Sequence, residues 1–219
     1  MRILKPIITI ISVFMSIGYG IALVNTPNLN VNTPFLRYFL YGFVGFIPLW
    51  FIWGRKTAFF SIFEHEFTHL LVGILFFRKP HSFAVNESEG GAVSLYGGNF
   101  LITLAPYFLP TFTYILLPFY FIINPKFYLY YFALLGFLTS YHILSTMREF
   151  SYKQPDIIKS GKVFSTFFLL FANIFVYGFL IAFIIGGFKE AGLFIKKGFF
   201  ESENWIMLAI QKIKSQAKV

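Results

Sequence analysis

Two histidines and a glutamate in one short segment have the spacing of a metal-dependent hydrolase. His65, Glu66 and His69 form the pattern His-Glu-x-x-His. Residues four apart lie on one face of a helix, so both imidazoles can reach a single zinc ion. The Glu66 carboxylate can take a proton from a zinc-bound water that attacks a carbonyl carbon. Glu64 points about a quarter-turn away from His65, and we expect it to bond an imidazole or another polar neighbour instead of the metal.

A second group of polar residues lies on a later apolar segment. Thr139, His142, Thr146 and Glu149 are spaced three, four and three apart, which predicts one polar stripe on a helix. In a membrane helix such a stripe should face the bundle interior or a water path. His142 is thus a candidate zinc ligand, a neighbour of the ligands that stabilises the oxyanion, or a buried histidine bonded to another helix. Glu149 is a candidate partner for a neighbouring cation.

The composition indicates a membrane protein. Of the 219 residues, 57% are hydrophobic, 22% aromatic and only 12% charged, whereas soluble domains have about 25% charged residues. This composition excludes a soluble cytosolic enzyme, and the absence of cysteine excludes a disulfide-stabilised module. The net charge of +9 comes from cations between the apolar runs, which fits contact with anionic lipid headgroups and argues against nucleic acid as a partner.

Six apolar runs are long enough to cross a hydrocarbon core about 30 Å thick. They lack the alternation of a membrane barrel, so we expect helices. The predicted spans are residues 6–24, 36–53, 58–77, 100–123, 127–146 and 163–187. The sequence therefore predicts an all-α, multi-pass integral membrane protein in which the motif lies on the third span.

Two further segments differ from these spans. Residues 78–98 are polar and rich in glycine, and two β-prone runs, 83–85 and 92–96, flank a turn-like segment over residues 88–91, which predicts a β-hairpin-like loop. Its edge is a candidate to capture an unwound substrate by strand addition, unless the segment is a simple solvent loop. Residues 188–219 have apolar residues at helical spacing and lysines near the end, which predicts an interfacial amphipathic helix. We therefore expect a membrane domain over residues 1–187 and an interfacial tail over 188–219.

The order of these features resembles the site-2 protease family of intramembrane zinc metalloproteases. The likeness covers roughly residues 58–187: a His-Glu-x-x-His helix, a glycine-rich β-prone loop and an aspartate that opens a later helix. It implies that His65 and His69 bind Zn²⁺, that Glu66 is the catalytic base and that Asp156 is the third ligand. It also implies a substrate-positioning role for Asn99, which like His142 is a candidate to stabilise the oxyanion.

The sequence departs from the family pattern around two of these residues. The family aspartate usually stands in Leu-Asp-Gly or Pro-x-Asp-Gly, whereas Asp156 lies between Pro155 and Ile157. The family asparagine usually stands in Gly-Pro-x-x-Asn, whereas Asn99 directly follows Gly97 and Gly98. Asp156 would also be favoured by the helix dipole without a metal, because proline suits the first helical position. Since catalytic zinc generally has three protein ligands, Asp156, the only aspartate, remains the preferred third one, and His142 is the alternative.

Taken together, the residues predict a zinc-dependent endopeptidase that hydrolyses a peptide bond in or near a transmembrane segment of a membrane-protein substrate. Two other functions stay open. One is a non-catalytic membrane scaffold or binder that retains the protease fold. The other is a transporter that uses the histidines and the later polar stripe as an ion path.

Overall fold

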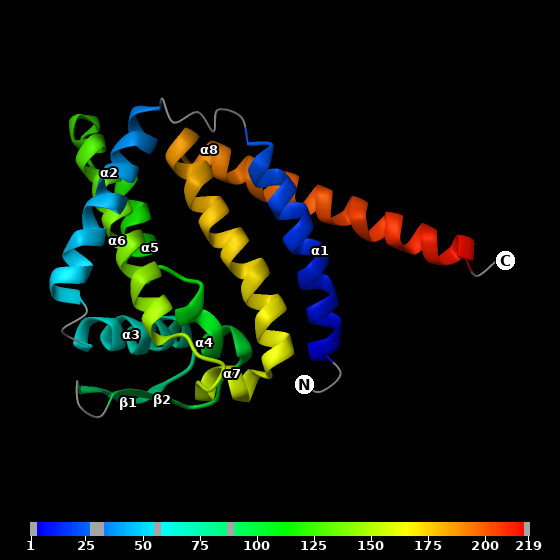
Figure 1. The fold of residues 1–219 in the computed structure, drawn as a ribbon, viewed down its shortest axis with the longest axis horizontal. Coiled ribbons are helices and arrows are strands. Elements are labelled where there is room, and N and C mark those ends of the chain that lie inside the picture. The colour runs from blue at the N-terminus through cyan, green and yellow to red at the C-terminus, as the bar shows by residue number, and fades with distance from the viewer. Residues whose placement is uncertain (1–3, 27–32, 55–57, 87–89, 217–219) are drawn as a thin grey trace. The chain divides into compact units, whose positions relative to one another are not determined.

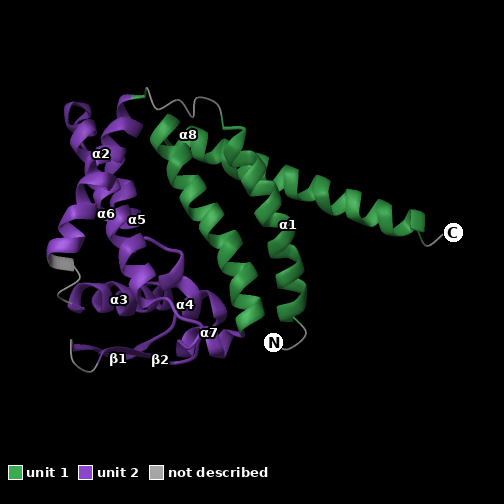
Figure 2. Ribbon diagram, viewed as in Figure 1, with its two compact units in different colours: residues 1–33, 162–219 green, residues 34–161 purple. Residues whose placement is uncertain are grey.

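The computed structural model describes residues 4–26, 33–54, 58–86 and 90–216 (Figure 1). The chain divides into two compact units, one of residues 1–33 and 162–219 and the other of residues 34–161 (Figure 2). All the residues singled out for chemistry belong to the second unit. The division at residue 187 into a membrane domain and a tail stays a prediction.

The first unit is built from α1 (Leu4–Val24) and α8 (Lys162–Gln216), which pack against each other. Non-helical conformations at Gly186 and Gly187 divide α8 into two helical parts. The second part packs on α1 through small residues, because a Cβ at Gly18 would collide with Ser202. Beyond Ser202 the described side chains are half-buried or exposed. The helix predicted for the tail is thus confirmed as far as residue 216, and its place at a membrane interface stays a prediction.

The second unit contains two long helices, α2 (Pro34–Leu49) and α6 (Tyr128–Glu149), packed side by side. Glycines bring their backbones close together: a Cβ at Gly136 would lie 1.9 Å from the carbonyl oxygen of Phe39. A π-helical segment, η1 (Trp50–Gly54), follows α2. The motif helix α3 (Phe59–Leu75) runs across the direction of α2 and α6 in Figure 1.

Two prolines divide the segment after the hairpin into short helices. Pro106 and Pro110 lack the backbone N–H that a continuous helix needs, and the chain bends by 95° between residues 100–107 and 111–121. The resulting elements are α4 (Phe100–Leu104), η2 (Ala105–Tyr107), α5 (Thr111–Leu116) and η3 (Leu117–Phe121). After them come η4 (Pro125–Phe127), α6 and the short α7 (Pro155–Ser160).

The described residues contain four helices that are long and apolar enough to cross a membrane, which indicates a membrane protein. They are Leu4–Val24, Pro34–Ile52, Pro125–Glu149 and Lys162–Gln216, and the bent pair over residues 100–121 makes a fifth if it is one span. The count of about six is therefore not confirmed. The segment predicted as a span over 58–77 forms α3, which has only 17 residues and carries the polar motif.

The loop after α3 is the predicted hairpin. β1 (Pro80–Asn86) and β2 (Gly90–Leu95) pair antiparallel, with Phe83 opposite Val93. β2 also lies along α3, where Gly73 and Gly91 leave room for close contact. A Cβ at Gly91 would lie 2.4 Å from Cγ of Glu66. The hairpin is thereby held beside the histidine motif.

Candidate functional site

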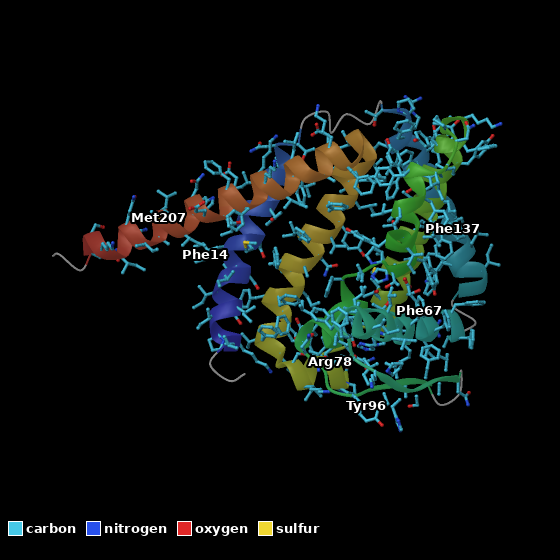
Figure 3. All side chains as sticks on the ribbon, turned by 180° about the vertical axis from the view of Figure 1, so that it is seen from behind. Phe14, Phe67, Arg78, Tyr96, Phe137 and Met207 are labelled. Carbon is cyan, nitrogen blue, oxygen red and sulfur yellow. The ribbon has the colours of Figure 1, made fainter. Side chains whose placement is uncertain are left out.

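The two faces of α3 have different chemistry. On one face Phe63 and Phe67 stack on Phe112 of α5, with ring centroids 6.4 and 6.0 Å from it (Figure 3 labels Phe67). Residues two positions away on a helix lie about 200° round the axis, so this anchoring turns His65 and His69 to the opposite side. The helical period thus presents the two imidazoles together, as the motif predicts.

Three possible ligand atoms converge beside α3. Nε2 of His65 lies 3.4 Å from Oδ2 of Asp156, and Nε2 of His69 lies 3.2 Å from the same oxygen. All three atoms lie within 4.8 Å of one another. Bonds of about 2.1 Å to a tetrahedral zinc ion would place its ligands roughly 3.4 Å apart. The observed separations therefore suit a metal ion, although hydrogen bonds have the same lengths.

The hydrogen bonds of the two Nδ1 atoms indicate whether the Nε2 atoms of His65 and His69 carry protons. Nδ1 of His69 lies 2.8 Å from the carbonyl oxygen of Ile102, which can only accept a hydrogen bond, so this nitrogen carries a proton. Nδ1 of His65 lies 3.3 Å from a carboxylate oxygen of Glu149, which favours a proton there too. In the neutral rings both Nε2 atoms then present lone pairs to the Asp156 carboxylate. Such a cluster is stable only if protons or a metal cation lie between these atoms, so the donor set fits zinc.

Asp156 stands in the first turn of α7, where Pro155 begins the helix. The hydroxyl of Tyr107 donates a hydrogen bond of 3.3 Å to Oδ2 of Asp156. Burial alone would raise the pKa of Asp156, but its hydrogen bonds with His65 and His69 hold it well below its usual range. The carboxylate is thus kept ionised, which is the form that binds a cation.

Glu66 lies between this cluster and the hairpin. Its carboxylate accepts a hydrogen bond from the backbone N–H of Val93 on β2. It also borders a cavity of about 550 Å³, which His65, His69, Asp156 and residues 91–95 help to line. The Glu66 carboxylate, three possible ligand atoms and a strand therefore face the same open space.

The residues of the polar stripe on α6 do not all lie at the candidate site. Glu149 contacts His65, whereas His142 contacts Glu64. Nδ1 of His142 lies 3.1 Å from Oε1 of Glu64, and both side chains are buried. Nε2 of His142 lies 3.4 Å from the hydroxyl of Thr146. Among the described residues, the group with metal-ligand spacing contains Asp156 and not His142. Glu64 thus bonds an imidazole as expected, but that imidazole belongs to His142.

Asn99 has a local role in the fold. Its side-chain oxygen accepts a hydrogen bond of 2.9 Å from the N–H of Ile102 and so caps α4. That cap fixes the start of the helix whose Ile102 carbonyl holds His69. The proposed contact between Asn99 and a substrate stays a prediction.

Sequence reasoning missed three partners of the site. They are the Tyr107 hydroxyl, the Ile102 carbonyl and the Glu149 carboxylate. Glu149 was singled out as the end of the polar stripe and as a partner for a cation, but its contact with His65 was not predicted. No sequence signal identifies a backbone carbonyl or one tyrosine among thirteen as a partner.

A comparison of the chain with protein-family models, curated proteins and solved structures found no match. The likeness to site-2 proteases accordingly depends on the few residues that the motif and the later aspartate supply.

Proposed function

We propose that this chain is a zinc-dependent endopeptidase of the site-2 protease type that cleaves a membrane-associated peptide segment. One observation supports this most directly: two imidazole nitrogens and a carboxylate oxygen converge within 4.8 Å beside a cavity that also contains Glu66. Catalytic zinc uses this number and kind of ligand and keeps one position open.

Each residue of the cluster has a defined task in this proposal. His65, His69 and Asp156 would hold the ion, and Tyr107 and Ile102 orient two of these side chains. When bound, zinc supplies Lewis-acid chemistry, lowering the pKa of a water molecule to about 7 and polarising a carbonyl group. The carboxylate of Glu66 accepts the proton as the peptide carbonyl is attacked and then delivers it to the leaving nitrogen.

The hairpin offers a place for the substrate. A helical segment cannot present its carbonyls for hydrolysis, because they are hydrogen-bonded within the helix, so a substrate must be extended locally. In an antiparallel pair, alternate residues direct their backbone groups away from the partner strand. Val93 does so, because its N–H reaches Glu66. An extended peptide lying in the cavity beside β2 would therefore have its carbonyls close to Glu66.

The decisive experiment uses the full chain purified in detergent and a quenched-fluorescence peptide with one apolar segment. We expect zinc-dependent cleavage by the wild type, and loss of cleavage with retained zinc in Glu66→Gln. The control is Glu64→Gln, which removes the same charge two residues away, where the carboxylate faces His142. Full activity in Glu66→Gln would refute the proposal, and bound zinc with no cleavage of any membrane segment would favour the scaffold function.

A further inference from the structure

Glu149 lies at the edge of the candidate centre, and its carboxylate has no role in the proposed hydrolysis. Its Oε2 lies 3.3 Å from Nδ1 of His65, on the opposite side of the ring from Nε2. Among the described residues, the group with metal-ligand spacing contains His65, His69 and Asp156 but not Glu149. Glu149 therefore lies behind a ligand and does not itself occupy a ligand position.

The backbone holds Glu149 in this position. It is the last residue of α6, and the side-chain nitrogen of Gln154 donates a hydrogen bond of 2.9 Å to its carbonyl oxygen. Gln154 directly precedes α7, the helix that carries Asp156. One short connection thus ties the group behind His65 to the third possible ligand.

Stability does not explain why a carboxylate stands here. Oε1 of Glu149 is buried and has no hydrogen-bond partner within the part of the chain that the structure describes. A buried oxygen left without a partner reduces stability. A group that is unfavourable for the fold but touches a possible ligand is better explained by what it does to that ligand.

The Nδ1 atoms of the two histidines also have different hydrogen-bond partners. His69 donates to the neutral carbonyl of Ile102, whereas His65 faces a carboxylate. A carboxylate behind a ligating imidazole fixes the ring and its tautomer and makes the metal-facing nitrogen a stronger donor. The affinity of His65 Nε2 for a metal ion should therefore depend on the charge of Glu149.

We propose that Glu149 is a positioning residue of the metal centre, which accepts the Nδ1 proton of His65 and so aims Nε2 of that ring at the ion. This inference depends on the proposed metal centre but not on the proposed proteolysis. It separates Glu149 from Glu64, a buried carboxylate whose imidazole partner is His142.

The test measures zinc affinity by competition with a chromophoric chelator, on the full chain in detergent. Glu149→Ala should weaken zinc binding by about 10- to 100-fold. Glu149→Gln keeps an acceptor and loses the charge, so its affinity should fall between those of the wild type and Glu149→Ala. The visible spectrum of the cobalt-substituted protein should shift in both variants and stay unchanged in the control Glu64→Gln.

Each outcome has one meaning. Wild-type affinity and an unchanged cobalt spectrum in both Glu149 variants would overturn the positioning role and leave the metal centre standing. No zinc or cobalt binding by the wild type would overturn the metal centre itself. If Glu149→Ala does not fold, Glu149→Gln decides the matter, with thermal unfolding of the metal-free protein as the measure of folding.

Discussion

Replacing Gly91 by alanine tests how closely β2 lies on the motif helix. A Cβ at this position would lie 2.4 Å from Cγ of Glu66 and 2.6 Å from Cγ2 of Ile62. Carbon atoms in ordinary contact are about 3.5–4.0 Å apart, so something must move by roughly 1 Å. Either β2 is displaced from α3, or the Glu66 side chain turns and gives up its bond to the N–H of Val93.

Both movements separate the base from the strand that would hold the substrate. A displacement of about 1 Å at a reacting group can lower a rate by about 100-fold, or about 2.7 kcal/mol in the activation barrier. We therefore expect kcat/KM of Gly91→Ala to fall by about two orders of magnitude. Zinc content should not change, because the atoms nearest to the new methyl group belong to Glu66 and Ile62 and not to His65, His69 or Asp156.

The assay compares cleavage of the fluorescent peptide by Gly91→Ala with that by Gly98→Ala. Gly98 also borders the cavity, but a Cβ there meets nothing within 4 Å. The control should therefore keep wild-type activity. Equal activity in both variants would refute the close packing of β2 on Glu66 in the working protein, and loss of zinc from Gly91→Ala would show that the change spreads beyond the base.

Two further predictions concern the candidate site and one concerns the packing of α6 on α2. Glu66→Gln should lower kcat by about 10²- to 10⁴-fold, measured on zinc-loaded protein, since it removes a general base; a smaller effect would argue for another base. Asp156→Ala should abolish stoichiometric zinc while His142→Ala retains it, as measured by elemental analysis; the reverse result would move the third ligand to α6. Gly136→Ala should destabilise the protein by about 1–3 kcal/mol in thermal unfolding, because its Cβ would meet a carbonyl oxygen of α2, whereas Gly45→Ala, with nothing within 4 Å, should not.

The sequence by itself determines the features that depend on local spacing. The four-residue interval of His65 and His69 puts both rings on one face of α3, because the helical period is the same wherever the helix packs. The β-prone runs on either side of residues 88–91 likewise predict the hairpin, because the whole signal lies within one short segment. Gly90 and Gly91, which were expected in the turn, instead pair with Asn86 and Val85 in the sheet, and residues 88–89 lie outside the described part of the chain. The apolar composition indicates a membrane protein before any fold is known.

Only the tertiary structure decides which of these local features meet. Asp156 and His142 were both open as partners of the motif; the fold brings Asp156 to His65 and His69, and His142 to Glu64. These pairs are separated by 78 to 91 residues, and no local periodicity relates them. Contacts of this kind depend on how helix faces pack. That packing depends on the glycines of α2 and α6, on the break at two prolines and on the short connection to α7. The candidate centre is therefore a property of the whole unit.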